Sequence, residues 1–127
     1  MSFVFSKRSE NNLIGVHPDL VKVVRRALEI SDVDFAVIEG MRTLERQKQL
    51  VKAGASQTLK SRHLTGHAVD LAPFIAGTIR WDWPPFNTIA IAMKQAALKL
   101  DVSIVWGGDW VSFKDGPHFE LNRKVYP

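Results

Sequence analysis

The chain has 127 residues, 46% of them hydrophobic and 24% charged, which predicts one folded domain spanning residues 1–127. It contains no cysteine, which excludes disulfide bonds and thiolate metal sites and leaves His, Asp and Glu as possible metal ligands. The formal net charge of +4 favours an anionic partner, but the Lys and Arg residues are scattered rather than gathered in a nucleic-acid-binding arm. We therefore expect no nucleic-acid partner.

The first residues, MSFVFSKRSENN, carry no pattern typical of a secretion signal or a membrane anchor. Lys7 comes before any apolar h-region, and nowhere along the chain do about eighteen apolar residues follow one another. We therefore expect a protein without a signal peptide, made in the cytoplasm and not inserted stably into a membrane.

A helix followed by a buried strand is predicted in the first third of the chain. Pro18 suits the first turn of a helix with a broad apolar stripe that ends near Ser31, and His17 would stand at its entrance in a surface or capping role. FAVIE, residues 35–39, is short, rich in β-branched residues and bounded by Gly40, as is typical of a buried strand.

The rest of the chain alternates between helices and short strands. Thr43 can cap a helix that runs to about Ala53, and Gly54 suits the end of that helix. AVDLAPF, residues 68–74, is typical of a second strand with an acidic residue at its middle. The remaining expected elements are a loop over 77–85, a helix over 87–100, and strands over 103–106 and 118–121. This order predicts an α+β fold in which a small sheet is covered on one face by helices.

SRHLTGHAVDL, residues 61–71, contains two histidines and an aspartate. His63 and His67 have the i, i+4 spacing of HExxH zinc enzymes, but the Glu is missing and Thr-Gly between them is a poor helix former. The segment is more typical of a turn that leads into a strand. A bend at Gly66 could then bring His63 beside Asp70 and supply two of the ligands that a metal needs.

DGPHFEL, residues 115–121, could complete such a site. His118 begins a predicted strand, and Asp115 precedes it by three residues. Two histidines and one carboxylate with a free fourth position are typical of catalytic zinc sites, and Asp115 would be the spare carboxylate that acts as general base. Spacing alone leaves unrelated surface histidines equally open, because short motifs often match by chance.

Both segments resemble the signature SxHxxGxAxD, and its second half, of the zinc peptidases that include the VanY and VanX D-alanyl-D-alanine peptidases and the bacteriophage L-alanyl-D-glutamate endolysins. The likeness covers nearly the whole chain, because GVHPDLVKVVRRAL, EGMRTLERQKQLVKAG and WGGDW also occur in the family's order. It is closest to the short, single-domain phage endolysins. The resemblance implies a Hedgehog/DD-peptidase-like fold, mainly antiparallel, with a zinc site at the sheet and no separate cell-wall-binding domain.

The resemblance also implies roles for particular residues. His63, Asp70 and His118 match the family's Zn²⁺ ligands, and Asp115 matches its catalytic carboxylate. Arg42 matches an arginine that would stabilise the developing oxyanion or hold a substrate carboxylate. The alternative for Arg42 is a solvent-exposed arginine at the start of a helix.

Neighbouring side chains are given lesser roles. His67 falls at a variable position of the signature and is predicted not to be a ligand. Ser61 and Thr65 are expected to form hydrogen bonds in the turn, and Ser61 is also a candidate for substrate binding. Asp109 is interpreted as a turn residue after two glycines. Four tryptophans could line a cleft or pack in the core and loops: Trp81, Trp83, Trp106 and Trp110.

The function implied is that of a zinc-dependent endolysin that hydrolyses the L-alanyl-D-glutamate bond of the peptidoglycan stem peptide and lyses the bacterial cell. Such a protein is expected to be a monomer that accumulates in the host cytoplasm and reaches the periplasmic cell wall after a holin or other damage permeabilises the membrane. Two alternatives remain open. One is a D-alanyl-D-alanine dipeptidase or carboxypeptidase of the same family, and the other is a non-catalytic, zinc-containing wall-binding module.

Overall fold

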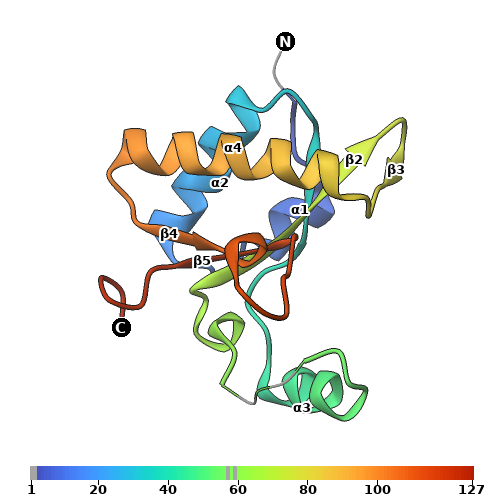
Figure 1. Cartoon of the computed structure of the whole chain (residues 1–127), viewed down its shortest axis with the longest axis vertical. Helices are drawn as coiled ribbons and strands as arrows, with labels where there is room; N and C mark the ends of the chain where they lie inside the picture. The colour runs from blue at the N-terminus through green and yellow to red at the C-terminus, as the bar shows by residue number, and fades with distance from the viewer. Residues whose placement is uncertain (1–2, 57, 59) are drawn as a thin grey trace.

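An antiparallel sheet forms the centre of the computed structural model, which describes residues 3–56, 58 and 60–127 (Figure 1). Within these residues the strands run in the order β1-β2-β5-β4, and β3 pairs with the far end of β2. The strands are β1 (Phe35–Glu39), β2 (Ala68–Ile75), β3 (Thr78–Ile79), β4 (Ile104–Trp106) and β5 (His118–Leu121). All the pairings are antiparallel, so the predicted α+β class is confirmed.

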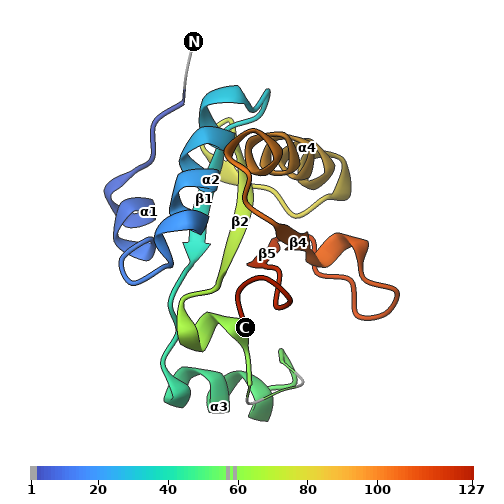
Figure 2. The same cartoon turned by 90° about the vertical axis from the view of Figure 1, so that its left-hand side faces the viewer.

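Helices lie at both ends of the molecule. They are α1 (Lys7–Asn12), α2 (Pro18–Ile30), α3 (Leu44–Lys52) and α4 (Trp83–Leu100), with short 3₁₀ helices η1 (Arg62–Thr65) and η2 (Gly107–Asp109). Both views place α3 at the opposite end of the molecule from α2 and α4 (Figures 1 and 2). Among the described residues, no helix has both the length and the apolar character that crossing a bilayer requires.

The two faces of the sheet differ because successive side chains of a strand point to opposite sides. On one face the side chains are apolar and fully buried. On β2 and β5 these are Val69, Leu71, Phe119 and Leu121. These pack with the apolar stripes of α2 and α4 in one core. The intervening residues Asp70, His118 and Glu120 therefore lie on the other face, where α2 and α4 do not cover them.

Helix beginnings follow the predicted capping residues. The side chain of His17 accepts a hydrogen bond from the backbone N–H of Asp19 at 3.1 Å, so its predicted capping role is confirmed. Thr43 caps α3 by accepting from the backbone N–H of Arg46 at 3.1 Å. The short helix α1, which was not predicted, is capped in the same way by Ser6.

The segment 77–85 differs from its prediction as a loop. It contains the short strand β3 and the first turn of α4, which begins at Trp83 rather than Asn87. Pro84 and Pro85 do not interrupt this helix because the N–H groups of a first turn have no partner within the helix in any case. The prolines therefore mark the beginning of α4 and not a loop before it.

Candidate metal centre

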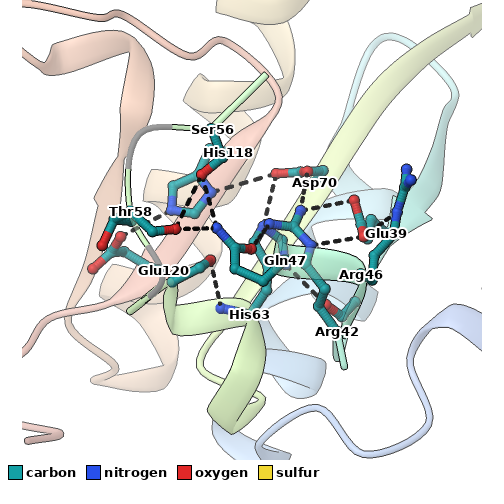
Figure 3. A network of polar contacts seen from close by, with 12 residues as sticks. Glu39, Arg42, Arg46, Gln47, Ser56, Thr58, His63, Asp70, His118 and Glu120 are labelled. Carbon is teal, nitrogen blue, oxygen red and sulfur yellow. Dashed lines mark hydrogen bonds and ion pairs between the residues drawn. The ribbon is translucent and has the colours of Figure 1, made fainter. Parts of the chain in front are cut away.

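Three residues from separate segments meet on the polar face of the sheet: His63 on η1, Asp70 on β2 and His118 on β5 (Figure 3). One possible ligand atom from each lies within 4.8 Å of the other two. Asp70 Oδ1 lies 3.2 Å from His63 Nε2 and 3.4 Å from His118 Nδ1. The structure thus brings together the two histidines and the carboxylate that the sequence singled out.

Strand pairing and a tight turn bring these three side chains together. Asp70 and His118 are direct partners in the antiparallel ladder between β2 and β5. His63 comes from η1, whose first turn is capped by the Ser61 hydroxyl, which accepts from the His63 N–H at 3.2 Å. Gly66 ends η1 with φ of +75°, and a Cβ there would lie 2.4 Å from the carbonyl oxygen of Gly15. Only glycine fits at that position, so the predicted bend at Gly66 is confirmed.

Each histidine directs one ring nitrogen toward Asp70 and the other toward an oxygen. His63 Nδ1 lies 2.8 Å from the carbonyl oxygen of Gly40. A carbonyl can only accept, so Nδ1 carries the hydrogen and Nε2 stays free. His118 Nε2 lies 2.8 Å from Glu120 Oε1, which leaves its Nδ1 toward Asp70. In their neutral forms, which metal ligation requires, both rings would therefore present a nitrogen lone pair to the same point.

The same contacts shift the pKa values of the centre. Burial by itself raises the pKa of Asp70, but hydrogen bonds with His118 and His63 outweigh it and hold the pKa well below its usual range. Burial lowers the pKa of His118, while hydrogen bonds with Asp70 and Glu120 raise it to about 9. Without a metal, His118 is therefore protonated at neutral pH. A cation that binds here displaces that proton, which makes metal affinity depend on pH.

Asp115 reaches the centre from the loop before β5. Its backbone N–H donates to the carbonyl oxygen of Gly107 at 3.1 Å, and its own carbonyl accepts from the His118 N–H at 3.2 Å. A Cβ on Gly107 would lie 2.4 Å from the Asp115 carbonyl oxygen, so the glycine permits this approach. Burial, with repulsion from Asp70, raises the pKa of the Asp115 carboxyl. A raised pKa suits a carboxylate to accept a proton from water.

Arg42 lies beside the centre in a buried ion pair. Its Nε and Nη2 donate to the two carboxylate oxygens of Glu39 at 2.8 and 2.7 Å, and its Nη1 donates to Gln47 Oε1 at 2.7 Å (Figure 3). Nη2 also lies 3.6 Å from Asp70 Oδ2, and the side chain is only 8% exposed. The alternative of a solvent-exposed arginine is therefore wrong. Arg42 therefore lies close to the second oxygen of Asp70 and also lines the adjoining cavity.

The centre opens into a cavity of about 340 Å³. Arg42, Ser61, Asp115 and the three clustered residues all line it. So does Trp81, whose side chain is largely exposed at the cavity mouth. The cavity is therefore within the size range of ligand-binding pockets, and its lining combines the clustered residues with Asp115 and Arg42.

The other predicted residues lie around this cavity or away from it. Asp109 does not line it and instead accepts from Lys94 Nζ at 2.8 Å on the surface. Trp110 packs its ring against His118, with centroids 5.1 Å apart. Trp106 is buried, and its indole N–H donates to the carbonyl oxygen of Gly116 at 2.7 Å, which holds the backbone between Asp115 and His118. Trp106 and Trp110 therefore contact the segment that carries His118 without lining the cavity.

Three polar residues of the site were not anticipated. Glu39 pairs in register with Asp70, Glu120 follows His118 by two residues on the same strand face, and Gln47 is fully buried on α3. The i, i+2 spacing of His118 and Glu120 was a usable signal, because it places both on one face of a strand. Nothing in the spacing of Gln47 indicated its contact with Arg42.

His67 stands outside the centre. Its Nδ1 lies 2.6 Å from the Thr65 hydroxyl, and its ring packs 5.6 Å from the ring of His17. Thr65 in turn donates to the Arg62 carbonyl oxygen at 3.2 Å, the turn role expected of it.

The environment of His67 predicts a pH effect on folding. Partial burial, followed by the electrostatic effects of Arg62 and His17, lowers the pKa of His67 in the folded protein. In the unfolded chain a histidine titrates near about 6.5. Above that pH His67 is neutral in both the folded and the unfolded state, so it does not change the free energy of unfolding. Below it the unfolded chain binds the proton more readily than the folded protein, so the free energy of unfolding falls until the pH passes the lowered pKa. We expect the free energy of unfolding to fall more from neutral to mildly acidic pH in the wild type than in His67→Gln, as measured by urea titration. Equal losses in the two proteins would show that His67 does not titrate in this way.

The chain is similar along nearly its whole length to known proteins. A family model described as phage L-alanyl-D-glutamate peptidase matches residues 1–126. The L-alanyl-D-glutamate peptidase of Escherichia phage T5 is 42% identical over 130 residues, covering 99% of this chain and 94% of that protein. The crystal structure of the Serratia marcescens L-Ala D-Glu endopeptidase ChiX has a TM-score of 0.92 and 51% identity, covering 98% of this chain and 94% of that one. The vancomycin-resistance D,D-dipeptidase VanXYg, 20% identical over 84% of this chain and 50% of its own, has a TM-score of 0.55 and shows a shared fold alone.

Proposed function

This chain belongs to the phage L-alanyl-D-glutamate peptidase family, and we propose that it hydrolyses the L-alanyl-D-glutamate bond of the peptidoglycan stem peptide with a zinc ion. Family membership confirms the resemblance found in the two motifs. The observation that carries the proposal is the cluster of His63, Asp70 and His118 at the base of a cavity that Asp115 also lines.

The donor set fits zinc. Nitrogen and oxygen ligands bind zinc at about 2.0–2.2 Å, so two ligands on a tetrahedral ion lie about 3.3–3.6 Å apart. The distances from Asp70 Oδ1 to His63 Nε2 and His118 Nδ1, 3.2 and 3.4 Å, are close to that spacing. Three protein ligands would leave a fourth position of a tetrahedral ion for water or substrate, as in catalytic rather than structural zinc sites.

The residues of the cavity have different roles in amide hydrolysis. A zinc ion held there supplies Lewis acidity that activates water and polarises the scissile carbonyl. Asp115 accepts a proton from the attacking water and delivers it to the amine that leaves. Its place in the cavity and its raised pKa both support this role.

Arg42 and Ser61 are proposed to orient the substrate. Arg42 is held by Glu39, its Nη1 donates to Gln47, and it lines the cavity. It can stabilise the oxyanion or hold a carboxylate of the substrate. Ser61, which lines the cavity and caps η1, is the candidate for a hydrogen bond to the peptide backbone.

The place of action follows from the substrate. A peptidase of peptidoglycan meets its substrate at the bacterial cell wall. We propose that this protein acts there as a monomeric endolysin, after a holin or other damage has permeabilised the host membrane. The net charge of +4 would help to retain it on an anionic wall.

Product analysis tests the proposal. Purified peptidoglycan digested with the zinc-loaded protein is expected to release new L-alanine carboxyl and D-glutamate amino ends, identified by mass spectrometry of the muropeptides. A chelator is expected to stop the release, and added zinc to restore it, because zinc would supply the Lewis acidity that activates the water.

Three other outcomes would contradict the proposal. Free D-alanine or D-Ala-D-Ala, with the L-Ala-D-Glu bond intact, would assign the chain a D,D-peptidase specificity. Binding to the wall without any cleavage would assign it the role of a wall-binding module. Undiminished cleavage after verified removal of zinc would refute the metal mechanism.

A further inference from the structure

We propose that Glu120 is a positioning residue that fixes the ring of His118, so that Nδ1 and not Nε2 binds the metal. This inference rests on the zinc site of the proposed function. It concerns the affinity and geometry of that site, not the bond that is cleaved.

Glu120 follows His118 by two residues on β5, so both side chains lie on the same face of the strand. Glu120 Oε1 lies 2.8 Å from His118 Nε2, and the two side chains are only 9% and 8% exposed (Figure 3). A buried carboxylate can only accept, so the hydrogen of the neutral imidazole belongs on Nε2. The lone pair then lies on Nδ1, the nitrogen that faces Asp70.

The second carboxylate oxygen of Glu120 lies near two arginines, the largely buried Arg62 and the exposed Arg123. Arg62 Nε lies 3.9 Å and Arg123 Nε 3.5 Å from Glu120 Oε2. Arg62 is anchored by hydrogen bonds from Nη2 to the carbonyl oxygens of Leu121 and Tyr126, at 3.2 and 2.6 Å. Within the described part of the chain, its buried Nε has no hydrogen-bond partner, so the nearby charge of Glu120 compensates it. One carboxylate oxygen is thus directed at the arginines and the other at His118.

The alternative ring orientation is costly. Turning the imidazole over about its Cβ–Cγ bond would remove the hydrogen bond and leave a buried carboxylate oxygen unsatisfied. Asp70 would also lose the contact with Nδ1 that the present orientation provides. Glu120 therefore selects both the rotamer and the tautomer of His118.

The two histidines are held by different means. His63 Nδ1 is bonded to the main-chain carbonyl of Gly40, which a side-chain substitution does not remove. His118 depends on the side chain of Glu120. Of the two hydrogen bonds that orient these rings, only the one to His118 can therefore be deleted by changing its acceptor residue.

The test compares Glu120→Ala with Arg123→Ala as a matched control. Arg123 touches the same carboxylate but is 64% exposed, and its loss leaves the contact between Glu120 and His118 intact. Zinc affinity is measured on metal-free proteins by competition with a chromogenic chelator. We expect about a 10- to 100-fold weaker zinc affinity in Glu120→Ala, the usual effect of losing an outer partner of a metal ligand. Arg123→Ala is expected to bind zinc as the wild type does.

A second readout reports on the ring itself. In ¹⁵N–¹H spectra of the zinc-loaded wild type, His118 is expected to ligate through Nδ1, with an Nε2–H proton protected from exchange by Glu120. In Glu120→Ala that protection is expected to be lost, an effect that a merely structural role would not produce. This measurement on the wild type decides the proposal even if Glu120→Ala does not fold.

Ligation of the wild type through His118 Nε2 would overturn the proposal, as would wild-type zinc affinity in Glu120→Ala. Either result leaves the proposed function intact, because zinc would still be bound at the same three residues. A wild-type protein that binds no zinc would overturn both.

Discussion

Asp115→Asn is expected to lower the rate of peptide cleavage by about 100- to 10,000-fold, the usual contribution of a general acid-base group, while zinc stays bound. Asparagine keeps the size of the side chain but cannot accept the proton of the attacking water. Asp115 is not one of the three clustered residues, so its loss removes no candidate ligand. Folding raises the pKa of its carboxyl, which means that the charged form is disfavoured in the folded protein. The neutral substitute should therefore not destabilise the fold.

The measurement is kcat on purified muropeptides together with the zinc content of the same samples. Asp109→Asn is the matched control, because Asp109 is also a carboxylate between β4 and β5, at the end of η2, but pairs with Lys94 on the surface. It is expected to retain activity. Wild-type kcat in Asp115→Asn would remove Asp115 from the mechanism, and loss of zinc from that variant would make it a ligand instead.

His63→Ala is expected to lose both zinc and activity, whereas His67→Gln keeps both. His63 is 2% exposed and directs Nε2 at Asp70, while the His67 ring packs against His17, outside the centre. Removing a direct ligand should weaken zinc binding by more than the approximately 10- to 100-fold that loss of an outer partner costs. The i, i+4 pair thus separates into one residue that the reaction needs and one that it does not.

Zinc content after dialysis and the rate of muropeptide cleavage test this pair of variants. Circular dichroism serves as the check that both have folded, since His63 also bonds the backbone at Gly40. A His67→Gln protein that loses zinc while His63→Ala keeps it would falsify the proposed ligand set. The Asp115 and His63 variants are complementary, because one is expected to be inactive with zinc and the other inactive without it.

Much of the element order was predictable because local patterns carry it. The buried strand Phe35–Glu39 and the capped helix that follows Thr43 occur at the expected places. The misplaced beginning of α4 has a local cause as well, since Trp83-Pro84-Pro85 is compatible with both a loop and a first helical turn. The strand β3 was missed because two residues are too few to show an alternating pattern.

Arg42 illustrates a role that depends on distant parts of the chain. Its position after a strand and before a helix was compatible with an exposed side chain. The structure buries it between Glu39 and Gln47, and close to Asp70. Burial of an arginine is stable only with such partners, and these partners come from two strands and a helix. No spacing rule relates them.

The amino-acid sequence by itself offered His63, Asp70 and His118 as a candidate donor set, and the resemblance of their two segments to the zinc-peptidase signature, not their spacing, singled them out. The sequence also determined the bend at Gly66, a position whose backbone conformation favours glycine. The tertiary structure alone decided which ring nitrogen of each histidine faces the centre, and that Glu120 accepts a hydrogen bond from the other ring nitrogen of His118. Those features depend on hydrogen bonds of about 3 Å between separate elements, and only packing of the whole sheet brings atoms to such distances.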